Sequence, residues 1–456
     1  MFNQSSALII MTAPRIILLL LALIPSLCRA VDFSGNTLPA IEITPAASSG
    51  LGAVYVLDNT QGVSMVYNTN YHYVTVYKFS NLGAAYEERI YSMAAIGTSQ
   101  HKIPLEKGDM GYHIKDQGGD TYIWITDYSA HRLSMESISP ALEQDCARTL
   151  INFNGYAAEI PYYSINGRRL TLSRELNVSY STLEFDESAF AFSLVQADET
   201  IDAVANSFSV PAPLCNTTFT LSGDRFLRTW GMAESIESGY FNSITVDAQT
   251  RATQDADLPD NQIKDNSSDD GLGGSAPCTI EFEAAVSDAA IYHEWQISRY
   301  PDFDVIDNSF SELTFSYTFT EQGTSYVRLL ADNADATCPY EGIVYQVFIG
   351  ESKLEIPNAF SPQGSPGVND EWKVSYKSLV TYECHIFNIW GKELFRSTDP
   401  AQGWDGKSGG KYVPAGVYYY VIKARGADGV DYKRAGDINI INYNPGSGTS
   451  QSPGDY

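Results

Sequence analysis

Short alternating runs rich in Val, Ile, Tyr and Thr constrain the fold of this 456-residue chain more than any other feature. The clearest examples are residues 53–57, 73–77 and 122–125. A period of two places successive side chains on opposite faces of a strand, whereas an amphipathic helix requires a period of 3.6. Helical periodicity is scarce, and the 30 tyrosines suit half-buried strands. The sequence therefore predicts an all-β fold built of tandem β-sandwiches.

Turn and linker signals divide the chain into modules. Residues 160–165 and 168–172 flank Asn166-Gly167, a pair that tolerates the positive φ angles of a hairpin turn. Residues 255–276 are acidic, Gly-rich and poor in apolar side chains, so we expect a linker or a long surface loop. The predicted organisation is a signal peptide (1–30), a β-sandwich (31–142), an Ig-like β-rich domain (143–254), a linker (255–277), a third sandwich (278–352), a small C-terminal β-sandwich (353–444) and a disordered tail (445–456).

The first 30 residues have the pattern of a secretory signal. Arg15 supplies a positive charge, and the apolar run 16–24 is too short to span a bilayer as a helix. Pro25 ends that run, and Cys28-Arg29-Ala30 provides small residues at the −3 and −1 positions of a cleavage site. Met11 would give a signal of ordinary proportions as the starting residue. We expect cleavage before Val31 and export of the mature chain.

The net charge of −26 is unevenly distributed. Residues 353–456 carry 11 basic and 11 acidic groups, and residues 1–30 carry two arginines, so residues 31–352 have a net charge of −28. Nucleic acids and anionic membranes bind Lys and Arg patches, and the sequence therefore excludes nucleic acid as a partner. Solubility at a crowded cell surface explains the acidity more simply than an acidic recognition face does.

Residues 278–350 resemble a known type of module. Trp295 lies between Cys278 and Cys338, which is the arrangement of an Ig-like sandwich. Residues 319–323 and 326–329 also resemble the turn and late strand of the PKD domain family. The resemblance implies a PKD- or Ig-like fold for residues 278–352 without indicating a ligand.

Five cysteines remain after removal of the signal, so at least one is free or pairs with another chain. The Ig-like arrangement implies a disulfide between Cys278 and Cys338, since export allows disulfides to form. A second bridge between Cys146 and Cys215 is the less favoured expectation, because a joint separates their surroundings. We expect Cys384, on a strand of the C-terminal domain, to be the free thiol.

Six ordered sequence blocks from residue 354 onward resemble the gliding motility-associated C-terminal domain, also called the type B sorting domain of the type IX secretion system of Bacteroidetes. A series of six blocks is far more specific than one short motif. The residues that carry the resemblance are Pro357, Asn358, Phe360, Asn369, Asp370, Trp372, Phe387, Trp390, Gly391, Trp404, Asp405, Gly406, Gly416, Tyr418 and Gly436.

The resemblance implies export across the outer membrane to the cell surface. It also implies two partners, the type IX secretion machinery and an outer-membrane partner of the sorting domain. Trp390 and Trp404 are expected to pack the core of this domain. The family's Asn-Gly-Asp-Gly loop reads Gln363-Gly364-Ser365-Pro366-Gly367 here and lacks the acidic ligand, so no calcium or other cofactor is expected.

Enzyme signatures are missing from the sequence. It contains no Gly-x-Ser-x-Gly elbow and no His-Glu-x-x-His helix, and no two of its six histidines have the spacing of a metal pair. We therefore predict a protein that is not an enzyme, with no catalytic, cofactor-binding or metal site. The favoured hypothesis is a structural or adhesive surface protein with an unidentified surface ligand. The alternatives are a component of the secretion or envelope-signalling apparatus and a carbohydrate-active enzyme.

Overall fold

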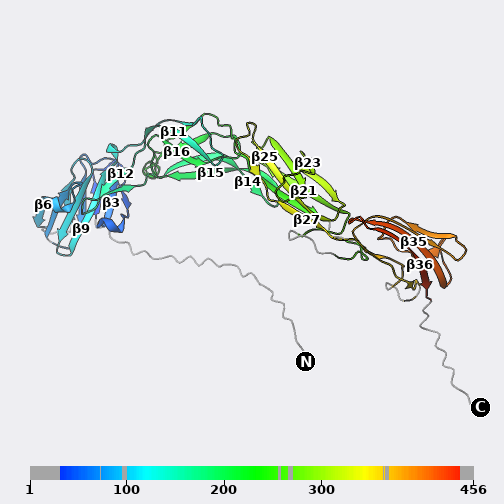
Figure 1. Cartoon of the computed structure of the whole chain (residues 1–456). Helices are drawn as coiled ribbons and strands as arrows, with labels where there is room; N and C mark the ends of the chain where they lie inside the picture. Colours follow the sequence, from blue (N-terminus) through cyan, green and yellow to red (C-terminus); the bar gives the residue numbers. More distant parts are fainter. Residues whose placement is uncertain are drawn as a thin grey trace, which may run out of the picture.

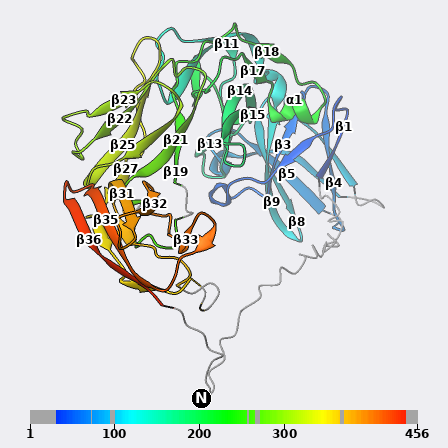
Figure 2. The same ribbon diagram turned by 90° about the vertical axis from the view of Figure 1, so that its right-hand side faces the viewer.

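The computed structural model describes residues 31–71, 73–94, 100–254, 258–264, 271–362, 364 and 369–441. Four β-modules follow one another in a curved row, with the first module (blue) and the fourth (orange to red) at opposite ends (Figure 1). Figure 2 looks along the row from the end of the fourth module and shows that the modules follow a curve. The predicted all-β fold is confirmed. The signal peptide and the C-terminal tail predicted from the sequence lie outside the described residues.

The first module is a sandwich of a three-stranded and a six-stranded sheet. Its core lies between the sheets and includes Tyr55, Met65, Val76, Tyr112 and Ile123. The strands, in sheet order, are β1 (Val31–Ser34), β4 (Ser64–Asn68) and β7 (Gln100–Pro104), then β2 (Ile41–Ile43), β3 (Ala53–Leu57), β9 (Gly119–Asp127), β8 (Met110–Asp116), β5 (Tyr73–Phe79) and β6 (Glu88–Ala94). Three 3₁₀ turns are η1 (Ala47–Ser49), η2 (Ala84–Tyr86) and η3 (Tyr128–Ala130).

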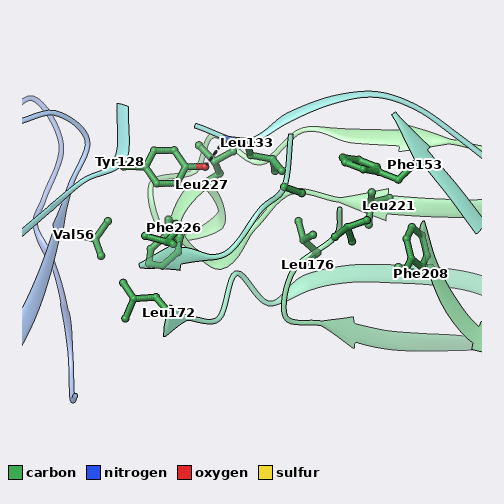
Figure 3. Packing of buried hydrophobic residues seen from close by; sticks show 14 of the residues in the cluster. Val56, Tyr128, Leu133, Phe153, Leu172, Leu176, Phe208, Leu221, Phe226 and Leu227 are labelled. Atoms are coloured by element: carbon green, nitrogen blue, oxygen red, sulfur yellow. Dashed lines mark hydrogen bonds between the residues drawn. The ribbon is translucent and has the colours of Figure 1, made fainter. Parts of the chain in front are cut away.

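The six-stranded sheet is covered on both faces at β3, which explains why the five side chains of this strand are all apolar and buried and do not alternate in exposure. Ala53, Tyr55 and Leu57 face the core of the first module. Val54 and Val56 belong to a second cluster that continues into the next module (Figure 3). The first two modules therefore share one continuous apolar core.

The second module consists of a three-stranded and a four-stranded sheet. The hairpin predicted at Asn166-Gly167 is confirmed, and Ile165 beside its turn contacts Gly50 of the first module. The strands are β10 (Ser134–Pro140), β11 (Arg148–Tyr156) and β16 (Ser207–Pro211), β15 (Ala191–Ile201), β14 (Leu176–Asp186), β17 (Phe219–Ser222) and β18 (Ser235–Glu237), and the hairpin β12 (Ile160–Tyr163) with β13 (Arg169–Leu172). One short helix, α1 (Arg225–Thr229), follows β17.

A buried ion pair strengthens the junction of the first two modules. Arg174 and Asp224 are both fully buried, and Arg174 Nη1 lies 2.6 Å from Asp224 Oδ2. The guanidinium also donates to the carbonyl oxygens of Ala158 and His131. The hydroxyl of Tyr128, the first residue of η3, donates to the same carboxylate oxygen over 3.0 Å. The paired charges thereby fix η3 of the first module against α1 of the second.

The third module is also a two-sheet sandwich, with Trp295 and Phe282 at its centre. Its strands are β19 (Ala248–Gln254), β21 (Cys278–Val286) and β24 (Thr314–Phe319), then β20 (Leu272–Gly274), β27 (Tyr345–Ile349), β25 (Gly323–Asp332), β22 (Tyr292–Ser298) and β23 (Asn308–Phe310), with β26 (Tyr340–Glu341) paired to β25.

Strand pairing shifts three of the predicted boundaries. β10 pairs with β11, although the prediction assigned them to different domains. β19, predicted to close the second domain, pairs with β21 over seven residues. β20 lies inside the predicted linker and pairs in parallel with β27. The boundary errors share one cause, because composition locates loops but does not show which strand pairs across them.

The predicted disulfide between Cys278 and Cys338 is wrong. Cys338 instead pairs with Cys146, with Cα atoms 5.6 Å apart, and the less favoured Cys146–Cys215 pairing is wrong as well. The bond joins the β10–β11 loop of the second module to the loop before β26 of the third. Cys215, Cys278 and Cys384 are free and buried, so the expectation of a free Cys384 is confirmed.

The length of β25 explains why Cys278 cannot reach Cys338. Cys278 Sγ contacts the Gly273 carbonyl, and Gly273 lies beside Phe348, the partner of Thr324. The backbone of Cys338 contacts the Asp332 carboxylate. Thr324 and Asp332 are eight residues apart along β25, which corresponds to roughly 26 Å. Disulfide formation requires Cα atoms within about 7 Å.

Candidate functional site: the C-terminal module

The C-terminal module is built around a five-stranded sheet and two small two-stranded sheets. The long central strands β35 and β31 alternate over most of their length, so one face contributes Cys384, Ile386, Tyr418 and Ile422 to the core. The strands are β29 (Ala359–Phe360), β36 (Asp431–Ile440), β35 (Gly416–Gly426), β31 (Leu379–Phe387) and β32 (Glu393–Ser397), β28 (Lys353–Glu355) with β30 (Ser375–Lys377), and β33 (Lys407–Ser408) with β34 (Lys411–Tyr412).

Two tryptophans of the sequence motif hold distant loops together. Trp372 and Trp404 are both buried and form an antiparallel bridge through two backbone hydrogen bonds of 2.9 and 3.0 Å. Trp372 Nε1 donates to the Pro357 carbonyl, and Trp404 Nε1 donates to the Lys407 carbonyl. Because both indole N–H groups are satisfied, these bulky side chains can be buried without a polar penalty. The expected core position of Trp404 is confirmed.

Other motif residues complete the same end of the core. The rings of Phe360 and Tyr418 each lie 5.5 Å from the Trp404 ring. The Tyr418 hydroxyl donates to the Pro414 carbonyl. Asn358 accepts the backbone N–H of Asn439 and so helps to anchor the start of the module beside β36. These motif residues therefore have a structural role.

Motif glycines occupy positions where a larger residue would either clash with a neighbour or strain the backbone. Gly406 has φ +76°, and a Cβ there would approach the Pro362 ring to 2.9 Å. Gly436 lies across from Tyr420, whose ring covers the space that a Cβ would fill. Gly416 and Gly391 also have positive φ values, with open space around them. Close packing explains the first two glycines, and backbone conformation explains the other two.

The motif acids lie in turns. Burial disfavours the charged form of Asp405, but hydrogen bonds from the Lys407 ammonium and backbone N–H outweigh it and lower the pKa of the carboxyl. Asn369 has φ +54°, and its carbonyl accepts the Ser361 N–H. Asp370 follows it and is half-buried. Most of the loop at residues 363–367, where no calcium was expected, lies outside the described residues.

Trp390 differs from the other motif tryptophans, and its predicted core position is wrong. It lies in the turn between β31 and β32, and 84% of its surface is exposed. Asn388 and Gly391 surround it, and both are residues that favour turns. That local signal could have placed Trp390 at the surface before the structure was known. Phe387, the last residue of β31, is half-buried beside His385.

A segment of the predicted linker also belongs to this site. The side-chain amide of Asn261 donates to the carbonyls of Val374 and Pro400, each over 2.8 Å. The Ile263 N–H donates to the Tyr376 carbonyl, and Gln262 bridges to Tyr376 in parallel. Residues 258–264 therefore cover the edge of β30 that does not pair with β28. The composition of this segment had instead indicated a linker.

The described part of the chain has no group of three or more His, Cys, Asp or Glu side chains placed to hold a metal ion. An open depression of about 570 Å³ on the third module is lined by Tyr292, His293, Glu294, Asp332 and Tyr340, among others. None of the described helices is both long and apolar enough to cross a membrane.

Comparison with known proteins gave two family matches. Residues 354–440 match the CHU_C type IX secretion signal domain. Residues 138–238 match the fibronectin type III domain and cover the second module from β10 to β18. No curated protein matches the chain.

Several solved structures overlap the chain at low similarity. A tetra-tandem repeat from the extending region of a large adhesion protein has 9% identity and a TM-score of 0.21, with coverage of 85% of this chain and 97% of that one. A Ca²⁺-stabilised ice-binding adhesin of an Antarctic bacterium has 10% identity and a TM-score of 0.18, with coverage of 83% and 93%. Latent PorU from Porphyromonas gingivalis has 11% identity and a TM-score of 0.15, with coverage of 71% and 35%.

The family matches and the geometry agree on the C-terminal module. The matched range begins in β28 and ends with β36, so it spans one complete folded unit. The chain therefore carries a type IX secretion signal domain of the CHU_C family at residues 354–440, preceded by a fibronectin type III domain at residues 138–238.

Proposed function

We propose that the chain is exported to the surface of a Bacteroidetes-type bacterium and has a structural or adhesive role there. The observation that carries the proposal is the match of residues 354–440 to a secretion signal family, over a unit that packs its own core. Residues 1–30 direct passage across the inner membrane and are then removed. The C-terminal domain directs passage across the outer membrane through the type IX machinery, with an outer-membrane partner.

The structural role is supported by the contacts between neighbouring modules. The first two share an apolar core and the buried Arg174–Asp224 pair. The Cys146–Cys338 disulfide joins the second to the third. Ser378 connects the third to the fourth, since its N–H donates to Ser275 Oγ and its hydroxyl accepts the Ala276 N–H. Because each junction is stabilised by specific contacts, the row can hold its first module away from the cell. That module would then be free to bind a surface ligand.

Truncation tests the proposal. A chain ending at Gly350 should lose its signal peptide normally but accumulate in the periplasm, because the signal for passage across the outer membrane has been removed and the signal peptide has not. Surface protease digestion and immunoblotting of cell fractions would measure the distribution. The full-length chain serves as the control. Arrival of the truncated chain at the surface in normal amounts would refute the proposal.

A further inference from the structure

The turn that carries Trp390 is closed by several hydrogen bonds. The Asn388 N–H donates to the Lys392 carbonyl, and the Asn388 carbonyl accepts the Gly391 N–H, each over 3.0 Å. Its side-chain Oδ1 accepts the N–H groups of Trp390 and Lys392 over 3.0 and 2.9 Å. Gly391 supplies the positive φ that closes the turn. Ile389 and Trp390 are consequently held in an exposed position by a well-defined turn.

More exposed apolar side chains lie at this end of the five-stranded sheet. Val417 and Tyr419 lie near the start of β35, and Tyr419 pairs with Phe387, the residue that precedes the turn. Ile441 follows the end of β36 and is also exposed. We call Ile389, Trp390, Val417, Tyr419 and Ile441 the tip patch.

Folding alone does not explain the tip patch. Trp390 is absent from the core that the other motif tryptophans build. An exposed tryptophan gains little of the hydrophobic stabilisation that a buried one provides, and it favours unwanted association. In contrast, an aromatic side chain on a hydrogen-bonded turn makes a good interface anchor, because little backbone freedom is lost on binding.

We propose that the tip patch is the surface by which the C-terminal domain docks onto a protein component of the type IX export machinery, with Trp390 as the anchor. The inference deepens the proposed function and rests on it. The domain matches a secretion signal family, so the machinery is the partner that this module must meet. Residues 353–456 have no net charge, against −28 for residues 31–352. Because the C-terminal module has no net charge, its docking should depend on apolar contacts more than on electrostatic attraction to the partner.

The test uses the full-length chain in a bacterium that has the type IX system. Trp390→Ala should lower the ratio of surface to periplasmic protein about tenfold or more, as expected for a hot-spot aromatic. Trp390→Phe should restore part of this ratio. The purified Trp390→Ala chain should keep the thermal unfolding midpoint of the wild type, since the side chain lies outside the core. If Trp390→Ala fails to fold, Ile389→Ser in the same turn provides the measurement, with the same loss expected.

Two controls change exposed apolar or aromatic side chains elsewhere on the chain. Val430→Ala alters an exposed apolar residue beside the Asp428-Gly429 turn, at the opposite end of the same sheet. Tyr292→Ala removes an exposed aromatic side chain from the third module. Both control chains should reach the surface in normal amounts. An export defect in either control as large as that of Trp390→Ala would overturn the assignment to the tip patch.

Failure of the inference can be distinguished from failure of the proposed function. If truncation after Gly350 blocks export but folded Trp390→Ala reaches the surface normally, the tip patch is wrong and the sorting function stands. If the truncated chain is exported, the sorting function itself is wrong. A photo-cross-linking residue at position 390 should join the chain to an outer-membrane protein only in cells with an intact type IX system. A cross-link to a second copy or to residues 442–456 would overturn the inference.

Discussion

At the scale of single residues, the stability of the first two modules should depend most strongly on the buried pair Arg174–Asp224. Removing one member leaves the other charge buried without its partner, which costs about 3–5 kcal/mol. We therefore expect Arg174→Met to lower the free energy of unfolding by that amount in urea denaturation. Replacing both residues with apolar side chains should cost less than the single change.

The exposed pair Arg169–Glu159 provides the control. Both of its side chains are about half exposed, and the pair lies on the neighbouring hairpin. Arg169→Met should change the free energy of unfolding by less than about 1 kcal/mol. Equal effects of Arg174→Met and Arg169→Met would contradict the role assigned to the buried pair.

The cysteines give a second prediction at this scale. Burial raises the pKa of the Cys278 and Cys384 thiols to about 11 in each case. The reactive thiolate is therefore rare at pH 8, and the folded chain should react with iodoacetamide at neither position until it is unfolded. Non-reducing peptide mapping should recover Cys146 linked to Cys338. A peptide that links Cys278 to Cys338 would contradict the structure.

At the scale of structural elements, the Trp372–Trp404 bridge holds the C-terminal domain together. Trp404→Ala removes a fully buried side chain and its hydrogen bond to Lys407, at a cost of about 3–5 kcal/mol. A domain of this size has little more stability than that to lose. The unfolding transition of this domain should therefore shift or disappear in calorimetry, and the variant should accumulate in the periplasm.

Substitutions at two tryptophans of the same motif should therefore have different phenotypes. Trp404→Ala should impair export by unfolding the domain, whereas Trp390→Ala should impair export and leave the domain folded. The calorimetric transition of the C-terminal domain separates the two effects. An unchanged transition in Trp404→Ala would show that the bridge does not stabilise the domain as described.

The sequence predicted the elements better than it predicted their partners. Short runs of strand-forming residues identified the strands around Tyr55, Trp124 and Tyr162, because β-propensity is read from neighbouring residues alone. The disulfide depended instead on which loops meet in space, and Cys146 meets Cys338 across a module junction that leaves no local trace. The contact of Asn261 with Val374 was missed for the same reason, since a segment's average composition does not reveal one well-placed amide.

At the scale of the whole molecule, we expect the contacts at the three junctions to keep the modules in fixed relative positions. The second junction depends on a covalent bond that can be removed without altering either core. Cys146→Ser with Cys338→Ser should therefore increase protease cleavage between the second and third modules and broaden the distance distribution in small-angle X-ray scattering. Cys215→Ser, which alters a buried free thiol, is the control. Identical scattering from the double variant and the wild type would show that the remaining contacts suffice to hold the junction.

The central claim is that the C-terminal domain targets this chain for export by the type IX system, and one measurement tests it most directly. The full-length chain is expressed in wild-type cells and in cells that lack the type IX outer-membrane channel, and intact cells are then labelled with an antibody against the first module. We predict strong labelling of the wild type, no labelling of the channel-deficient strain, and a pool of signal-cleaved chain in its periplasm. Equal surface labelling of the two strains would contradict the claim.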